Sequence, residues 1–259
     1  MQISAVIITF NEEDNIAPCI ESIEDVCDEI IVVDSFSTDK TIEIAEKYPK
    51  VKTFSQKWLG YVEQKNYANS LTTFNTILSI DADEVLSSQL KENILQLKEL
   101  KEETTEKVYE VSRLTNYCGS WIKHCGWYPD KKIRIFDKRS VKWQGELVHE
   151  TLSLPENAQI VHLKGDLLHY SYKSSADHIE RANKYSSLTA IEAFNRGKKS
   201  SAFDIWFRPK WRFFRDYIIK RGFLDGYAGY QVCKMSAFIT FSKYIKLREY
   251  ESIRKSQNR

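Results

Sequence analysis

The chain has 259 residues and a mass of 30.3 kDa, with 42% hydrophobic residues, 29% charged residues and a formal net charge of +2. This length predicts one large domain, or one domain with an appendage, and it is sufficient to bury a substantial core. The 33 aromatic residues exclude a disordered chain, and the nine Gly and five Pro exclude a collagen-like or linker protein.

The five cysteines form no CxxC pair. Their pattern therefore predicts neither a disulfide framework nor a zinc ribbon, and a reduced, cytoplasmic compartment is the simplest interpretation. The N-terminal residues lack the basic segment of a signal peptide, and no stretch approaches the roughly 20 apolar residues of a membrane-spanning helix. We expect a cytoplasmic protein.

The small net charge conceals an uneven distribution along the chain. Residues 196–259 hold sixteen Lys and Arg against five Asp and Glu, whereas residues 1–195 hold twenty-two basic and thirty-one acidic residues. An excess of basic residues in one part of a chain indicates an anionic partner for that part, either a nucleic acid or a membrane surface.

The first hundred residues alternate between strand and helix patterns. Short β-branched or apolar runs predict strands over 3–9, 29–34, 52–55 and 76–80, and apolar spacing predicts helices over 16–26, 40–48, 61–71 and 87–103. Helices that alternate with strands in this way are typical of βαβ units in a parallel sheet.

The middle of the chain predicts further strands over 108–113, 132–136, 147–152 and 166–170, which we expect to continue the sheet in partly antiparallel form. The last ninety residues are mostly helical, basic and aromatic. The prediction is an α/β catalytic domain over residues 1–172, with a mostly parallel sheet covered by helices on both faces, and a helical extension over residues 173–259.

Polar and acidic residues follow three of the predicted strands, at the ends where parallel sheets bind ligands. Asp81 and Asp83 come directly after one of these strands. Two carboxylates at this spacing can share Mg²⁺ or Mn²⁺, which would neutralise a diphosphate leaving group. A solvated acidic turn would have the same sequence.

Three segments resemble the family-2 glycosyltransferases, which are inverting enzymes with the Rossmann-like GT-A fold that use nucleotide-diphospho-sugars. The segments are Ile7–Glu13, Ile31–Thr41 and Ile80–Glu84. More narrowly, the chain is similar to the lipopolysaccharide inner-core β-glucosyltransferases in its segments Gly60–Asn66, Gly126–Asp130, Arg134–Phe136 and Leu147–Thr151.

The resemblance implies a set of residues that bind the sugar nucleotide or the sugar. Asp34 matches the acidic position that contacts the uracil or ribose, although it could instead be a helix-capping carboxylate. Lys65 would neutralise phosphate, although a Lys on a polar helix is usually solvated. The full set of substrate-binding candidates comprises Thr9, Asn11, Asp34, Gln64, Lys65, Asn66, Asp81, Trp127 and Arg134.

An inverting transfer needs a base for the acceptor hydroxyl, and a carboxylate is the usual choice. The first candidate is Glu150, with Glu146 and Asp130 as alternatives, and His149 is a candidate third metal ligand beside Asp81 and Asp83. The aromatic cluster around Trp127 could hold a sugar ring, and core packing explains such a cluster equally well.

Thirteen aromatic residues lie between Phe203 and Tyr244, interleaved with basic residues. This composition is typical of a segment that lies on an anionic membrane, and the resembled family acts on a lipid-anchored acceptor. Aromatic side chains that pack on the catalytic domain, with solvated charges around them, would have the same composition. Together with the resemblance, the sequence predicts a metal-dependent inverting glycosyltransferase. It would transfer a hexose, glucose from UDP-glucose, to a lipid-anchored saccharide such as lipopolysaccharide inner core at the inner face of a bacterial membrane. The alternatives are a nucleotidyltransferase that makes sugar nucleotides and a non-catalytic nucleic-acid- or membrane-binding protein. The acidic character of residues 1–195 argues against a nucleic-acid partner for the main domain.

Overall fold

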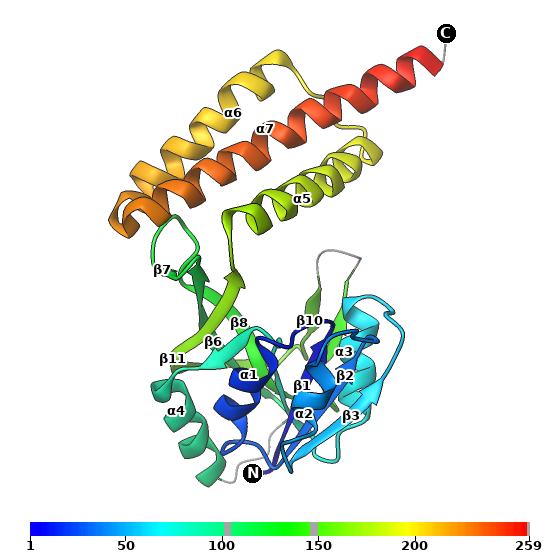
Figure 1. The fold of residues 1–259 in the computed structure, drawn as a ribbon, viewed down its shortest axis with the longest axis vertical. Helices are drawn as coiled ribbons and strands as arrows, with labels where there is room; N and C mark the ends of the chain where they lie inside the picture. The colour runs from blue at the N-terminus through cyan, green and yellow to red at the C-terminus, as the bar shows by residue number, and fades with distance from the viewer. Residues whose placement is uncertain (101–104, 146–149, 258–259) are drawn as a thin grey trace. The chain divides into compact units, whose positions relative to one another are not determined.

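A computed structural model describes residues 1–100, 105–145 and 150–257 (Figure 1). The chain forms two compact units. The first contains residues 1–113 and 130–169, and the second contains residues 114–129 and 170–259. The predicted division at residue 172 into a catalytic domain and an extension stays a prediction, because compact units are not functional domains. The segment 114–129 belongs to the second unit, which the sequence pattern did not indicate.

The main sheet has nine strands in the order β3-β2-β1-β4-β8-β6-β11-β5, with β7 paired to β6. The pairs β1–β2, β1–β4 and β2–β3 are parallel, and the pairs β4–β8, β6–β8, β5–β11 and β6–β7 are antiparallel. The strands of this sheet are β1 (Ile3–Thr9), β2 (Glu29–Asp34), β3 (Val51–Ser55), β4 (Thr76–Ser79), β5 (Glu84–Leu86), β6 (Lys107–Tyr117), β7 (Ser120–Ile122), β8 (Asp130–Asp137) and β11 (Gln159–Tyr172). A separate pair joins β9 (Lys142–Gln144) to β10 (Thr151–Ser153).

Helices cover both faces of the parallel strands. As a result β1 and β2 are buried on both sides, and their alternate residues belong to two different hydrophobic cores. On one face, Ile7 packs with α1 (Ile16–Ile23), α2 (Thr41–Ala45) and α4 (Ser88–Glu99). On the other face, Val6 and Ile31 pack with α3 (Tyr61–Ser70) and with β9. The mixed α/β architecture expected from the sequence is confirmed.

The second unit is mainly helical. It contains α5 (Ser175–Asn195), α6 (Ala202–Phe214), the π-helical segment Arg215–Ile219, a 3₁₀ turn at Gly222–Asp225 and α7 (Gly226–Gln257). Helices α5 and α6 both pack against α7, which lies between them (Figure 1). The predicted helical C-terminal extension is therefore present. Within the described residues, no helix combines the length and the apolar character that crossing a bilayer requires.

Most of the expected elements appear close to their predicted bounds. The strands over 3–9 and 29–34 agree at both ends, while the helix predicted over 40–48 is limited to Thr41–Ala45. The sequence pattern missed β5, β7 and β9, each of which has only three residues. A period of two cannot be recognised in so short a run.

Candidate functional site

The carboxyl ends of β1 and β2 lie side by side, because Thr9 pairs with Asp34 in the parallel register. Asn11 adopts a positive φ of 55°, and its side-chain oxygen accepts a hydrogen bond of 2.8 Å from the Thr38 backbone N–H. The buried Asp34 carboxylate accepts from the backbone N–H and the hydroxyl of Ser37. Asp34 therefore caps the turn after β2. The predicted contact of Asp34 with uracil or ribose stays a prediction and is compatible with this role.

Two buried polar atoms near these strand ends have no hydrogen-bond partner among the described residues. They are the Thr9 hydroxyl and the Gln64 side-chain carbonyl oxygen. The Gln64 amide nitrogen, in contrast, donates to the Ser35 hydroxyl at 3.2 Å. Buried polar groups are nearly always paired in folded proteins, so these two atoms at the end of a parallel sheet are available to hydrogen-bond a ligand. The exposed rings of Phe10 and Phe36 follow the same two strands.

Lys65 connects residues that are distant in sequence. Its ammonium lies 3.3 Å from Asp81 Oδ1 and 3.1 Å from Glu150 Oε1, and it stands 4.5 Å from the centre of the Trp143 ring. Lys65 is buried, with only 4% of its side chain exposed, which excludes the solvated position that a Lys on a polar helix usually has. The structure thus places the predicted base beside the first aspartate of the acidic motif.

Arg134 holds the other side of Asp81. Its guanidinium donates to Asp81 Oδ2 at 2.9 Å and also to Glu84, whose side chain is completely buried. Burial by itself would raise the pKa of Asp81, but Arg134 and then Lys65 lower that pKa well below its usual range. For Glu84, burial prevails over the attraction of Arg134 and raises the pKa. Arg113 adds a second cation, 3.4 Å from Glu84.

A cavity of about 520 Å³ lies within the first unit, beside the Lys65 and Arg134 ion pairs. Lys65, Asp81, Arg134 and Glu150 all line it, together with Trp143 and with charged residues of β6 and β8. A volume of this size is in the range of small-molecule sites. The cavity therefore offers a charged, partly enclosed space in which a carboxylate could meet a substrate hydroxyl.

The predicted metal site is only partly described. His149 lies outside the described residues, and both oxygens of Asp81 are paired with cations, so Asp83 is the most available carboxylate of the motif. Asp83 Oδ2 lies 3.2 Å from Nε2 of His169 on β11. Within the described ranges, no group of three or more His, Cys, Asp or Glu side chains converges as a metal site. The pair of Asp83 and His169 could still supply two ligands, with the remaining positions left for a diphosphate and water.

The structure gives two of the predicted substrate-binding residues other roles. The Asn66 side chain donates to the Trp143 carbonyl at 2.9 Å and accepts from the Trp143 N–H at 3.0 Å, so it attaches β9 to α3 and does not face a sugar. Trp127 belongs to the second unit, where it packs against Tyr117 and Tyr172, in agreement with the core-packing alternative.

The two alternative bases are also less suitable than Glu150. Asp130 is held by Arg113 at 2.6 Å and by Lys132 at 3.1 Å, and it is not among the residues that line the cavity. Glu146 lies outside the described residues.

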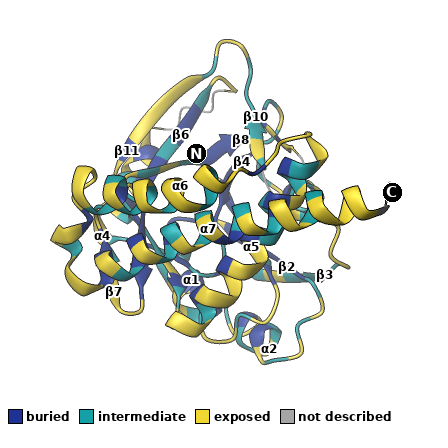
Figure 2. Cartoon of the chain, turned by 90° about the horizontal axis from the view of Figure 1, so that it is seen from above, coloured by how far each residue is buried: buried dark blue, intermediate teal, exposed yellow. Residues whose placement is uncertain are grey.

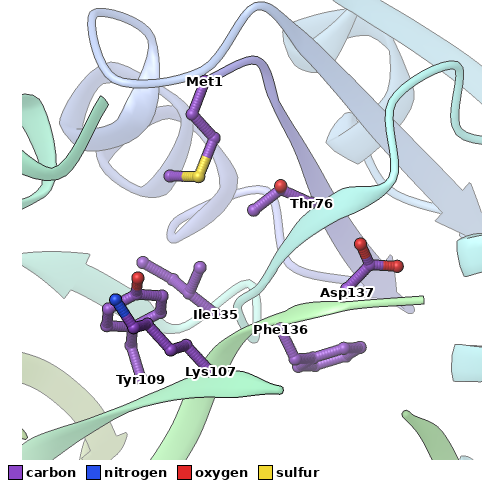
Figure 3. Close-up of a pocket in the computed structure, with 7 residues that line it drawn as sticks. All are labelled: Met1, Thr76, Lys107, Tyr109, Ile135, Phe136 and Asp137. Atoms are coloured by element: carbon purple, nitrogen blue, oxygen red, sulfur yellow. The ribbon is translucent and has the colours of Figure 1, made fainter. Parts of the chain in front are cut away.

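A second pocket lies at the opposite end of the parallel strands (Figure 3). Thr76, the first residue of β4, faces it together with Asp137, the last residue of the antiparallel β8. Its volume of about 10 Å³ is close to the minimum that one water molecule requires. This pocket cannot hold a sugar nucleotide.

Three residues of the site were absent from the sequence-based prediction. Glu84 directly follows the acidic motif, so its position was available as a signal. Arg113 ends a predicted strand and carries a charge there, which is a weaker signal. His169 reaches Asp83 only because β11 pairs with β5, opposite Glu84. That pairing joins segments more than eighty residues apart, and no local pattern predicts it.

Comparison with known proteins identifies the family of the chain. Residues 4–141 match the family described as glycosyl transferase family 2. The chain is 33% identical to an uncharacterized glycosyltransferase of Rickettsia typhi over 96% of its own length and 87% of the relative's. It is 29% identical to the lipopolysaccharide core biosynthesis glycosyltransferase LpsC of Rhizobium meliloti over 94% and 92% of the two chains.

A solved structure of S. aureus TarS residues 1–349 in complex with UDP-GlcNAc has a TM-score of 0.49 and 16% identity, and the match covers 95% of this chain and 92% of that one. Both the family match and the similarity to the Rickettsia typhi relative extend over more than half of the chain. The chain belongs to glycosyl transferase family 2 and is a glycosyltransferase.

Proposed function

We propose that the protein transfers a hexose, glucose from UDP-glucose, to a lipid-anchored saccharide such as lipopolysaccharide inner core. The observation that carries this proposal is the Lys65 bridge. It brings Glu150, which directly precedes β10, to the same cavity as Asp81. The relative from Rhizobium meliloti, named for lipopolysaccharide core biosynthesis, supports the choice of acceptor.

The nucleotide would bind at the ends of β1 and β2. There the Thr9 hydroxyl would donate or accept a hydrogen bond, and the Gln64 side-chain carbonyl oxygen would accept one. The exposed Phe10 ring offers a face on which a base could stack. Asp34, already fixed by Ser37, would accept from the uracil or the ribose.

Glu150 would act as the base. As a carboxylate 28% exposed at the cavity wall, it can accept the proton of an acceptor hydroxyl while that oxygen attacks the anomeric carbon. The bond to the diphosphate breaks as the new glycosidic bond forms, which inverts the configuration and gives a β-linked product. Lys65 would hold Glu150 in position and supply positive charge beside the leaving group.

The acidic motif and His169 fit a divalent cation, Mg²⁺ or Mn²⁺. Asp83 and His169 form an oxygen and nitrogen donor pair, and Asp81 next to them is kept ionised by its two cations. Such a cation would neutralise charge on the diphosphate. Arg134 and Lys65 would keep Asp81 oriented toward the donor.

The experiment that tests this function compares UDP-sugars as donors, with purified inner-core lipopolysaccharide as the acceptor, in the presence of Mn²⁺ or of a chelator. We expect UDP release from UDP-glucose that depends on both the acceptor and the cation. Glu150→Gln should lower the transfer rate by about 10²–10⁴-fold while UDP binding by calorimetry remains. The exposed Glu156→Gln is the matched control. Unchanged transfer by the Glu150 variant would refute the assigned base.

A further inference from the structure

Helix α6 is the most exposed helix of the second unit. It contains no buried residue, and it continues without interruption into the π-helical segment Arg215–Ile219. Its start is fixed by a capping box, in which the Ser201 side chain and the Asp204 side chain each accept from the other residue's backbone N–H. Residues 202–219 therefore form one well-defined helix with most of its outer surface uncovered (Figure 2).

The uncovered surface is apolar and aromatic. Trp206 is 68% exposed and Trp211 is 46% exposed, and the exposed large apolar side chains of this helix are Phe203, Trp206, Phe207, Trp211, Phe214, Ile218 and Ile219. At 3.6 residues per turn the five of these positions that lie in α6 fall within an arc of about 140°, and Ile218 and Ile219 lie in the π-helical segment that follows. The less exposed positions, such as Ile205 and Phe213, fall on the side where α6 packs against α7.

Basic residues border and interrupt this apolar stripe. Residues 202–221 hold six Lys and Arg against two Asp, and both Asp residues are paired with arginines of the same helix. The Lys210 ammonium lies 3.4 Å from the centre of the Trp206 ring, inside the stripe. Lys220 and Arg221 continue the positive charge at the end of the helix. The segment has a net charge of +4.

This combination selects one kind of partner. A protein partner that covered this apolar stripe would bury the Lys210 ammonium in the centre of the interface without a counter-charge, and burying an unpaired charge is energetically costly. A nucleic acid would leave most of the aliphatic and aromatic stripe in water. An anionic lipid surface accommodates both features, because aromatic side chains favour the interfacial region and Lys and Arg are attracted to the headgroups.

We propose that residues 202–221, which we term the α6 docking helix, lie in the surface of an anionic lipid bilayer, with the Trp206 and Trp211 rings at headgroup level. The charge complementarity with anionic headgroups and the exposed aromatic stripe carry this inference. It does not depend on the proposed transfer reaction, and it assigns to one helix the membrane attachment that the sequence predicts for the whole C-terminal segment.

The test measures co-sedimentation of the full-length protein with vesicles of phosphatidylcholine alone and with added phosphatidylglycerol. We expect binding only to the anionic vesicles, and weaker binding at high salt. Trp206→Ser/Trp211→Ser should reduce the partition coefficient at least roughly tenfold. Lys210→Gln/Lys220→Gln/Arg221→Gln should reduce it roughly 100-fold at low salt. Trp58→Ser removes a tryptophan of the first unit that is 45% exposed, and should bind like the wild type.

Circular dichroism establishes that each variant is folded, and quenching of tryptophan fluorescence by brominated lipid reports insertion independently of sedimentation. Undiminished binding by the double tryptophan variant would overturn the proposal, as would wild-type protein that ignores anionic vesicles. Loss of a dimer in that variant, without any vesicle binding by the wild type, would assign the stripe to a second copy of the chain instead. Binding of an oligonucleotide through these residues, with no vesicle binding, would assign it to nucleic acid.

Discussion

Replacing Arg134 with Met should destabilise the first unit through two carboxylates at once. Arg134 is 4% exposed, and it pairs with Asp81 and with Glu84, which is 0% exposed. Without the guanidinium, Glu84 keeps one cation, Arg113 at 3.4 Å, and the hydrogen bond from the Asp81 backbone N–H, while Asp81 keeps Lys65. Removal of one partner from a buried ion pair costs about 3–5 kcal/mol. We expect about 3 kcal/mol, the lower end, because each carboxylate retains one cation.

The double variant Arg134→Met/Glu84→Gln separates lost charge pairing from lost packing. If the penalty comes from the uncompensated Glu84 carboxylate, its removal should return a large part of the loss, and the two substitutions should be non-additive by more than about 0.5 kcal/mol. Arg139→Met is the matched control, since its pair with Asp137 involves an Arg side chain that is 51% exposed and should contribute less than about 1 kcal/mol.

Urea denaturation followed by circular dichroism gives the free energies of unfolding of these variants, and hydrogen exchange of peptides from β4 and β8 reports the first unit by itself. Two results would refute the reasoning. One is an Arg134→Met variant as stable as the Arg139→Met control. The other is strict additivity in the double variant, because both would mean that Glu84 does not depend on Arg134 for its charge compensation.

Two further predictions concern residues that position other elements. Asn66→Ala should remove both hydrogen bonds to the Trp143 backbone, lower the free energy of unfolding by about 1–2 kcal/mol and speed hydrogen exchange over β9. The control Asn93→Ala loses only an exposed side-chain hydrogen bond within α4 and should leave exchange over β9 unchanged. Equal exchange rates over β9 in the two variants would contradict the role of Asn66 in attaching β9 to α3. Burial, with a smaller contribution from Arg181 and against the opposing Asp177, lowers the pKa of His178 from 6.5 to about 4. Below pH 6.5 the unfolded chain therefore binds a proton at this histidine that the folded chain does not bind. The free energy of unfolding should fall by about 3 kcal/mol as the pH is lowered from 6.5 toward 4. A His178→Gln variant whose unfolding has the same pH dependence as the wild type would show this explanation to be wrong.

The sequence predicted the parallel half of the sheet well, because β1, β2 and β4 are short, mostly apolar runs that are buried on both faces and end at a polar residue, whereas β3 is only partly buried. β1 and β2 illustrate this, with Thr9 and Asp34 at their ends. The positions of Asp81 and Asp83 followed from the same local rule. What each carboxylate contacts did not, because the partners Arg134 and His169 come from antiparallel strands whose register depends on long-range pairing.

Asn66 shows a different limit of the sequence-based reasoning. Its residue type and motif are equally consistent with binding a sugar and with binding a backbone, and only the approach of β9 to α3 decides between them. The membrane prediction was limited in a different way, because it applied to a whole segment and not to single residues. Composition indicated a basic, aromatic segment of about sixty residues, but it could not separate the aromatic side chains that pack against α7, such as Phe213, from those that remain exposed, such as Trp206.

The buried charges around the cavity are better explained by ligand binding than by stability. Lys65, Arg134 and Glu84 are almost completely removed from water, and a well-packed apolar cluster of the same volume would often serve stability as well or better. Their arrangement fixes Asp81 between two cations and holds Glu150 beside one of them, so the charged groups need little reorganisation when a reaction develops charge. Apolar replacement of Lys65, Asp81, Glu84 and Arg134 together should therefore give a fold about as stable as the natural one that has lost sugar transfer.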